Sequence, residues 1–145
     1  MQLDFWQLSR DPVERVVALI AERTRGAGEK LLVVSENEEQ RGAVSRALWE
    51  SRAEAFLANG EADAPHAGRQ PILLSPRCEA DNGARYVVIA DGLWREGAEA
   101  FDRAFLLFDE AGTPAARAVW RQFDGREDVQ RSYYAQENGK WVKKA

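Results

Sequence analysis

Two amphipathic helical patterns separated by a short apolar run constrain the fold of this chain more than any other feature. In the first pattern apolar residues recur at i, i+3, i+4 and i+7: Val13, Val16, Val17 and Ile20. The apolar run, residues 31–34, is typical of a strand covered on both faces. A second helix follows a cap at Ser35 or Asn37, and its inward stripe is expected at Val44, Ala47 and Leu48. This strand–helix–strand–helix order predicts a parallel sheet.

The ends of the first helix carry recognisable signals. Asp11 is expected to cap the helix, Pro12 to occupy its first position, and Glu14 to complete a capping box. Gly26 and Gly28 are expected to end it.

Short apolar runs predict further strands at residues 3–8, 71–74, 86–90 and 104–108. Residues 57–70 and 76–84 lack periodicity and are expected to be loops, whereas 93–101 are expected to be partly helical. The last clear helix begins at Thr113-Pro114 and runs to about Phe123. Asn138-Gly139 lies between two strand-like runs and predicts a C-terminal hairpin.

These elements predict a single α/β domain over residues 1–145. We expect a three-layer sandwich: a mostly parallel sheet of about five to seven strands, helices on both faces, and the C-terminal hairpin.

Composition narrows the function classes. The net charge of −4 argues against a general nucleic-acid binder, so an anionic partner requires a local basic patch. The single cysteine, Cys78, argues against a disulfide framework and favours a reducing compartment. Residues 1–4 show no basic or apolar leader pattern, and no apolar run approaches the ~20 residues of a membrane helix. We therefore expect a cytoplasmic protein without a membrane partner.

The residues of familiar catalytic sites do not come together in this sequence. His66 is the only histidine and lies in a predicted loop, where a solvated side chain is expected. Cys78 has no histidine near it in sequence and is expected to be an inert, half-buried thiol. Residues 26–28 follow a helix and lack a third glycine, so they do not match a dinucleotide loop. Asp91 ends an apolar strand, but no phosphate loop accompanies it, so Asp91-Gly92 is expected to be a turn. We expect no catalytic residue, no cofactor and no metal.

The tryptophans include one on the second helix that lies beside the apolar stripe. Trp49 falls about 140° from Val44 around the helix axis, and Phe56 follows seven residues later. The two rings either fold over the sheet edge and fill a gap under the loop, or form an exposed anchor for a partner protein.

The last helix offers a second candidate surface. With Ala115 at zero, Trp120 falls near ~140°, Arg117 near ~200° and Arg121 near ~240°, so all three are expected on the outward arc. The inward face is expected to be Ala115, Ala118, Val119 and Gln122. Either the arginine stems cover the indole on a solvated face, or the three side chains bind an anionic ligand that carries an apolar group.

Across nearly its whole length the chain resembles the chi subunit family of bacterial DNA polymerase III. The resemblance rests on the order and spacing of several segments: LDFWQLSRDPVERVV at the start, Arg46-Ala47-Leu48-Trp49 with Phe56-Leu57, residues 69–74, residues 87–92, residues 116–121, and the tail at 138–144. Where many members have Pro-His-Gly after Phe-Leu, this chain has Ala58-Asn59-Gly60.

The resemblance implies a Rossmann-like fold without a nucleotide site and a non-catalytic role in DNA replication. It implies a subunit that links the clamp loader to single-stranded-DNA-binding protein, whose acidic C-terminal tail ends in a Pro-Phe carboxylate. The tail-binding positions correspond to Arg117, Trp120 and Arg121, with Phe123 nearby. Trp49 and Phe56 correspond to the aromatic pair that receives the psi subunit or a repair helicase. DNA would be contacted only indirectly.

Two alternatives remain open from the residues. One is a nucleotide-binding or nucleic-acid-dependent α/β enzyme. The other is direct binding of single-stranded nucleic acid by Trp120, Trp141 and Lys143-Lys144.

Overall fold

The computed structural model describes residues 1–51 and 57–145. Eight strands form one sheet in the order β3-β4-β2-β5-β6-β1-β7-β8, and every pairing is parallel except that of β7 with β8. The strands are β1 (Gln2–Gln7), β2 (Leu31–Val34), β3 (Asn59–Glu61), β4 (Ile72–Ser75), β5 (Tyr86–Ile89), β6 (Arg103–Phe108), β7 (Gln130–Glu137) and β8 (Lys140–Lys143). The predicted α/β class and C-terminal hairpin are confirmed, with one strand more than the largest number expected.

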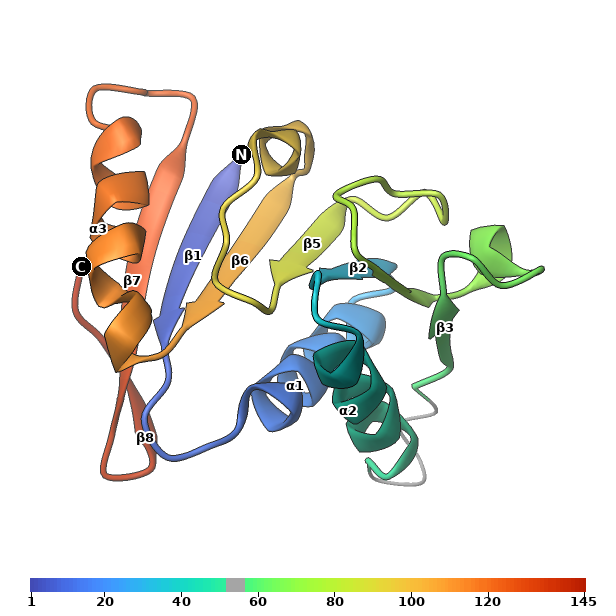
Figure 1. Cartoon of the computed structure of the whole chain (residues 1–145). Coiled ribbons are helices and arrows are strands. Elements are labelled where there is room, and N and C mark those ends of the chain that lie inside the picture. The colour runs from blue at the N-terminus through green and yellow to red at the C-terminus, as the bar shows by residue number, and fades with distance from the viewer. Residues whose placement is uncertain (52–56) are drawn as a thin grey trace.

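Helices cover both faces of the sheet, which makes the three layers visible in Figure 1. The helices are α1 (Val13–Gly26), α2 (Glu38–Trp49) and α3 (Thr113–Gln122), together with the short 3-10 turns η2 (Ala67–Arg69), η3 (Glu96–Ala100) and η4 (Glu110–Gly112). α1 and α2 pack on one face and on each other, whereas α3 lies on the other face along β7 and β1.

Strand alternation divides the core into two apolar clusters, one on each face. Leu3 and Phe5 of β1 point toward α3, and Trp6 points toward α1. On the α1 side, Leu31 and Val33 are fully buried, as expected of a strand covered on both faces. Each face of the sheet is therefore covered by apolar side chains that recur every three or four residues along the packed helix.

The start of α1 differs from its predicted capping. Pro12 is the N-cap residue, the helix begins at Val13, and no side chain caps it. Asp11 instead accepts a hydrogen bond from the Gln136 amide nitrogen at 2.8 Å. The Gln136 amide oxygen accepts the backbone N–H groups of Arg10 at 3.0 Å and Asp11 at 3.2 Å. A buried glutamine on β7 therefore fixes the β1–α1 loop, which sequence spacing alone does not show.

Two further expectations need correction. The segment 57–70 contains β3, which pairs with β4 through Asn59–Glu61 and has no apolar alternation that would predict a strand. On α3, Ala115, Ala118 and Gln122 are exposed, and the inward residues are Ala116, Val119 and the following Phe123. Val119 and Phe123 lie one helical turn apart and are both buried, so these two larger side chains decide which side of the helix faces the sheet.

Candidate functional site

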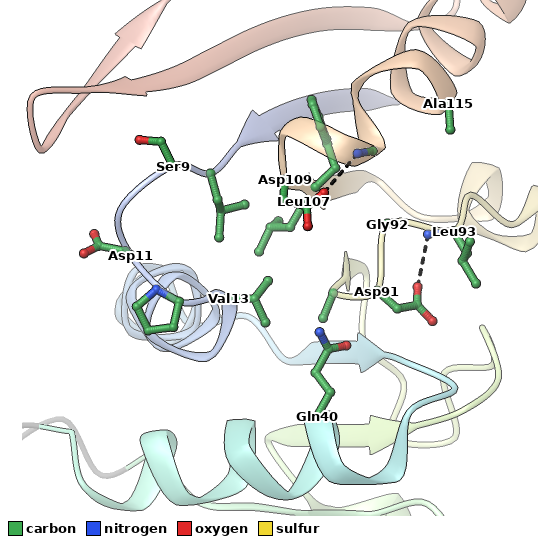
Figure 2. Close-up of a pocket in the computed structure, with 15 residues that line it drawn as sticks. Ser9, Asp11, Val13, Gln40, Asp91, Gly92, Leu93, Leu107, Asp109 and Ala115 are labelled. Carbon is green, nitrogen blue, oxygen red and sulfur yellow. Dashed lines mark hydrogen bonds between the residues drawn. The ribbon is translucent and has the colours of Figure 1, made fainter.

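A concavity at the carboxyl ends of the strands lies where the chain leaves β1 toward one face of the sheet and β6 toward the other. This point of reversal is where open α/β sheets commonly bind ligands. A cavity of about 420 Å³ opens there between the loops that follow β1, β5 and β6, with Gln40 of α2 on one side (Figure 2). A nucleotide-binding protein of this fold would hold its ligand in this cavity.

The polar groups of this cavity do not suit a phosphate. Its lining includes Asp11, Asp91 and Asp109 and contains no lysine, arginine or histidine. Asp109 accepts the N–H of Gly112 at 2.9 Å, which starts the turn into α3. The side chains of Asp91 and Asp109 both face the loop backbone in Figure 2. The lining therefore offers carboxylates and no cation of its own to a phosphate, so the cavity gives no support to the nucleotide alternative.

Asp91 acts as a structural acceptor at the end of β5. Its carboxylate accepts the backbone N–H groups of Glu36 at 2.9 Å and Leu93 at 3.1 Å, and pairs with Arg95 at 2.8 Å. Burial opposes its ionisation, but the hydrogen bonds from Arg95, Glu36 and Leu93 outweigh burial and lower its pKa. Gly92 adopts a φ of 76°, so Asp91-Gly92 forms the predicted turn.

Cys78 and His66, the other candidate catalytic side chains, do not form a site together. Burial raises the pKa of the Cys78 thiol, with Arg95 acting in the opposite direction, so Cys78 is a poor nucleophile at neutral pH. His66 lies at the start of η2, away from Cys78 in the chain. Within residues 1–51 and 57–145, no three His, Cys, Asp or Glu side chains are placed to hold a metal ion.

The α3 surface brings together a different set of side chains. Arg117 and Arg121 are exposed, as predicted, and neither forms an ion pair with any residue that the structure describes. Trp120 is not on the outward arc: it is partly buried, and its ring lies 5.1 Å from Phe5 and 6.2 Å from Tyr133. The indole therefore forms the floor beside the two arginines.

Two residues of β7 complete this surface. The Arg131 guanidinium lies over the Trp120 ring, 4.5 Å from its centroid, and also pairs with Asp124 at 2.8 Å. The Tyr133 hydroxyl donates to the Gln7 side chain at 2.6 Å. Burial raises the Tyr133 pKa, and Arg117 is close enough to lower it in part. Neither residue is predicted from the sequence, because the parallel pairing of β1 with β7 leaves no local signal. That pairing brings Arg131 beside Leu3 and Tyr133 beside Phe5.

Phe123 lies near this surface but is itself core. Its ring is 2% exposed, packs edge-on against Trp94 at 5.7 Å, and is covered by Arg126 at 5.4 Å. A ligand on α3 would not touch the Phe123 ring without a rearrangement, so its contribution is to hold the end of the helix in place. We call the surface formed by Arg117, Trp120, Arg121, Arg131 and Tyr133 the α3 site.

The second predicted surface lies on the other side of the molecule. Trp49 is the last residue of α2 and is 62% exposed, which makes it the most exposed large apolar side chain in the described ranges. α2 packs near β3 and β4, at the far end of the sheet from α3 (Figure 1). Phe56 lies outside the described residues. Trp49 and the α3 site are therefore separate surfaces.

The single-strand hypothesis needs a correction. Trp141 packs 4.7 Å from Trp6 in the cluster on the α1 face, whereas Trp120 belongs to the α3 face. The sheet separates the two indoles, so Trp120 and Trp141 do not form one continuous stacking strip.

The family described as DNA polymerase III chi subunit, HolC, matches residues 1–128, which end just before β7. The chain belongs to the DNA polymerase III chi subunit family, and this assigns it an accessory role in DNA replication. The segment 138–144, part of the resemblance in sequence, lies beyond that match. A search of the curated proteins found no match.

Among the described residues, no helix has the length and apolar character needed to span a bilayer.

Proposed function

We propose that this chain is a non-catalytic adaptor of the DNA polymerase III clamp loader that binds the acidic C-terminal tail of single-stranded-DNA-binding protein at the α3 site. The observation that carries this proposal is the pair of exposed guanidinium groups of Arg117 and Arg121 beside the partly buried Trp120 ring; neither has an ion-pair partner within residues 1–51 and 57–145. The membership in the chi family supports it independently.

The chemistry of the α3 site matches the tail. Arginine guanidinium groups offer paired N–H donors to carboxylates, and an indole flank offers apolar area to a terminal phenylalanine. Arg131 is already committed to Trp120 and Asp124, so Arg117 and Arg121 are the cations available to the ligand. A like-charge i, i+4 pair on a helix is mildly unfavourable without a counter-anion, which the tail would supply.

The strength of binding follows from the size of the ligand. A short tail makes few contacts and loses conformational freedom when it binds, so we expect a dissociation constant of about 1 μM. Salt should weaken binding because both partners are charged and exposed. The partner protein carries several tails when it coats DNA, so avidity would strengthen the attachment in the cell.

We further propose that Trp49, with Phe56, receives the psi subunit or a repair helicase. The exposure of Trp49 supports this, because a large apolar side chain in contact with water is typical of a protein-binding surface. The distance between α2 and α3 across the sheet would allow both partners to bind at once (Figure 1).

Titration of a labelled acidic peptide ending in Pro-Phe tests the α3 assignment. Arg117→Ala and Arg121→Ala should each weaken binding about tenfold, the value for loss of one charge-assisted hydrogen bond. The matched control is Arg15→Ala, which removes an arginine that is 74% exposed on α1. If all three variants bind the peptide as the unaltered protein does, the assignment is wrong.

A further inference from the structure

The strand β8 forms the edge of the sheet that is nearest α3, and the proposed function does not use it (Figure 1). Its neighbour in the sheet is β7, and its other side has no strand beside it among the described residues. The family match ends at residue 128, before β7 and β8 begin. Membership in the family therefore assigns no role to this edge.

The backbone of β8 alternates between groups that bond to β7 and groups that face outward. Lys144 N–H donates to the Tyr133 carbonyl at 2.7 Å, so the backbone of Lys144 faces β7. In an antiparallel pair this bonding alternates along the strand, so Val142 also faces β7, whereas Trp141 and Lys143 face outward. Neither outward N–H has an acceptor in the part of the chain that the structure describes. Trp141 and Lys143 therefore present unpaired donors and acceptors to a further strand.

The charge of this edge indicates what kind of strand would fit. Three of the four lysines of the chain lie in residues 140–144, although the chain has a net charge of −4. Lys144 pairs with Glu137, whereas Lys140 and Lys143 are exposed and have no ion-pair partner among the described residues. A second copy of β8 would bring like charges together, which disfavours pairing between two copies of this chain. An acidic strand would meet a lysine on each face, because Lys140 and Lys143 point to opposite faces of the sheet.

The same edge is continuous with the α3 site. Tyr133 N–H donates to the Ala145 carbonyl at 3.1 Å, so the chain after β8 runs beside a residue of the α3 site. Val142 lies opposite Ala135, shares the α3 face with Tyr133, and is 36% exposed. The next strand position lies two strand spacings from β7, about 10 Å, which about three extended residues span. A peptide with its carboxylate at the α3 site can therefore reach the outer side of β8 with the residues that precede the carboxylate.

We propose that β8 receives an extended acidic peptide segment as an added strand at the sheet edge. The inference rests on the proposed function, since the segment is the part of the tail that precedes the carboxylate bound at the α3 site. Its backbone would pair with the outward groups of Trp141 and Lys143, and its carboxylates would contact Lys140 and Lys143. It would run parallel to β8, because its carboxylate end lies where Ala145 meets Tyr133.

Two peptides separate this inference from the proposed function. The short peptide has about three residues and ends in Pro-Phe, and the long peptide adds the acidic segment before them. The long peptide should bind the unaltered protein about tenfold more tightly, because it adds backbone hydrogen bonds and charge contacts. If the two peptides bind equally, this inference is overturned while the α3 site stands. If neither peptide binds, both proposals are overturned.

Two substitutions at one position separate the backbone from the charge. Lys143→Pro removes an outward N–H but no bond to β7, and proline is tolerated at such edge positions. It should weaken binding of the long peptide about tenfold and leave the short peptide unaltered, which also shows that the hairpin keeps its place. Lys143→Gln keeps the N–H and should weaken the long peptide about threefold or less. Equal effects of the two substitutions, or none, would overturn the added strand.

Two further variants calibrate the peptide titrations. Arg121→Ala should weaken both peptides, because both carry the carboxylate. Arg69→Gln should weaken neither, since Arg69 is an exposed arginine on η2 without an ion-pair partner among the described residues.

Backbone hydrogen exchange, followed by nuclear magnetic resonance on the unaltered protein, tests the strand pairing without any substitution. Saturation with the long peptide should slow exchange of the outward N–H groups of β8, those of Trp141 and Lys143, about tenfold or more. The short peptide should leave both rates unchanged, and the Val142 N–H, which already faces β7, should be protected throughout. Unchanged exchange at Trp141 and Lys143 with the long peptide bound would overturn the proposal.

Discussion

The Arg131 guanidinium stacks on the Trp120 indole, with 4.5 Å between the guanidinium carbon and the ring centroid. Arg131 is on β7 and Trp120 on α3, so this contact joins the helix to the sheet at the α3 site. Its Nη1 donates to the Trp120 carbonyl and to Asp124, which balances its charge. In the proposed function, Arg131 would therefore hold the indole in place and would not be the cation that binds the tail.

Arg131→Gln tests this positioning role. The substitution removes a cation–π contact and a charged hydrogen bond, so the tail peptide should bind about three- to tenfold more weakly although Arg117 and Arg121 remain. The salt dependence of binding should stay as it is, because the binding cations are unchanged. Arg77→Gln, which alters an arginine with 69% exposure, is the control. A variant that binds with unaltered affinity would show that Trp120 needs no support from Arg131.

Trp49→Ala tests whether the Trp49 ring packs over the sheet edge or anchors a partner protein. Because Trp49 is 62% exposed, the free energy of unfolding should change by less than about 0.5 kcal/mol, measured by urea denaturation. Retention of the psi subunit in a pull-down should be lost. Leu93→Ala is the matched control, since Leu93 is 54% exposed and lies in the loop after β5, away from α2. A loss of stability with psi binding preserved would mean that the indole folds over the sheet and anchors no partner.

Asp91 should make stability depend on pH. Burial raises its pKa, but the hydrogen bonds from Arg95, Glu36 and Leu93 bring it below the ordinary value of 3.8. A carboxyl group with a lower pKa in the folded state stabilises the fold above its unfolded pKa, and this contribution is lost as pH falls through the folded value. Asp91→Asn should therefore lower the free energy of unfolding at pH 7 by about 1–3 kcal/mol.

The difference between Asp91→Asn and the unaltered protein should shrink when unfolding is measured at pH values falling below 3.8. Asp63→Asn, at an exposed carboxyl group, should show no such difference at any pH. A gap that stays constant down to acid pH would mean that Asp91 contributes packing and not charge.

Local sequence signals were sufficient for the elements whose conformation is set locally. The Asn138-Gly139 turn has φ values of 52° and 77°, which these residues adopt more readily than others. Asn37 caps α2 by accepting the Gln40 N–H at 3.1 Å. Val44 and Leu48 are buried because they fall on one side of that helix.

The α3 site could be predicted only in part, because its floor is assembled from distant segments. Arg117 and Arg121 are exposed as their angular positions indicate. The partial burial of Trp120 depends on Phe5 and Tyr133, which stack at 6.2 Å only because β1 and β7 pair in parallel. Helix angles measured from Ala115 could not predict the burial of Trp120. The side of α3 that faces the sheet is set in part by Phe123, which is buried just after the last turn of the helix.

The central claim is that the α3 site binds a terminal carboxylate. The most direct measurement compares an acidic peptide ending in Pro-Phe with the same peptide carrying a C-terminal amide, titrated against the unaltered protein and against Arg121→Ala. We predict that the amide binds about tenfold more weakly to the unaltered protein, and that the difference is much smaller in the variant, because Arg121 is then absent. Equal affinity of both peptides for the unaltered protein would contradict the account.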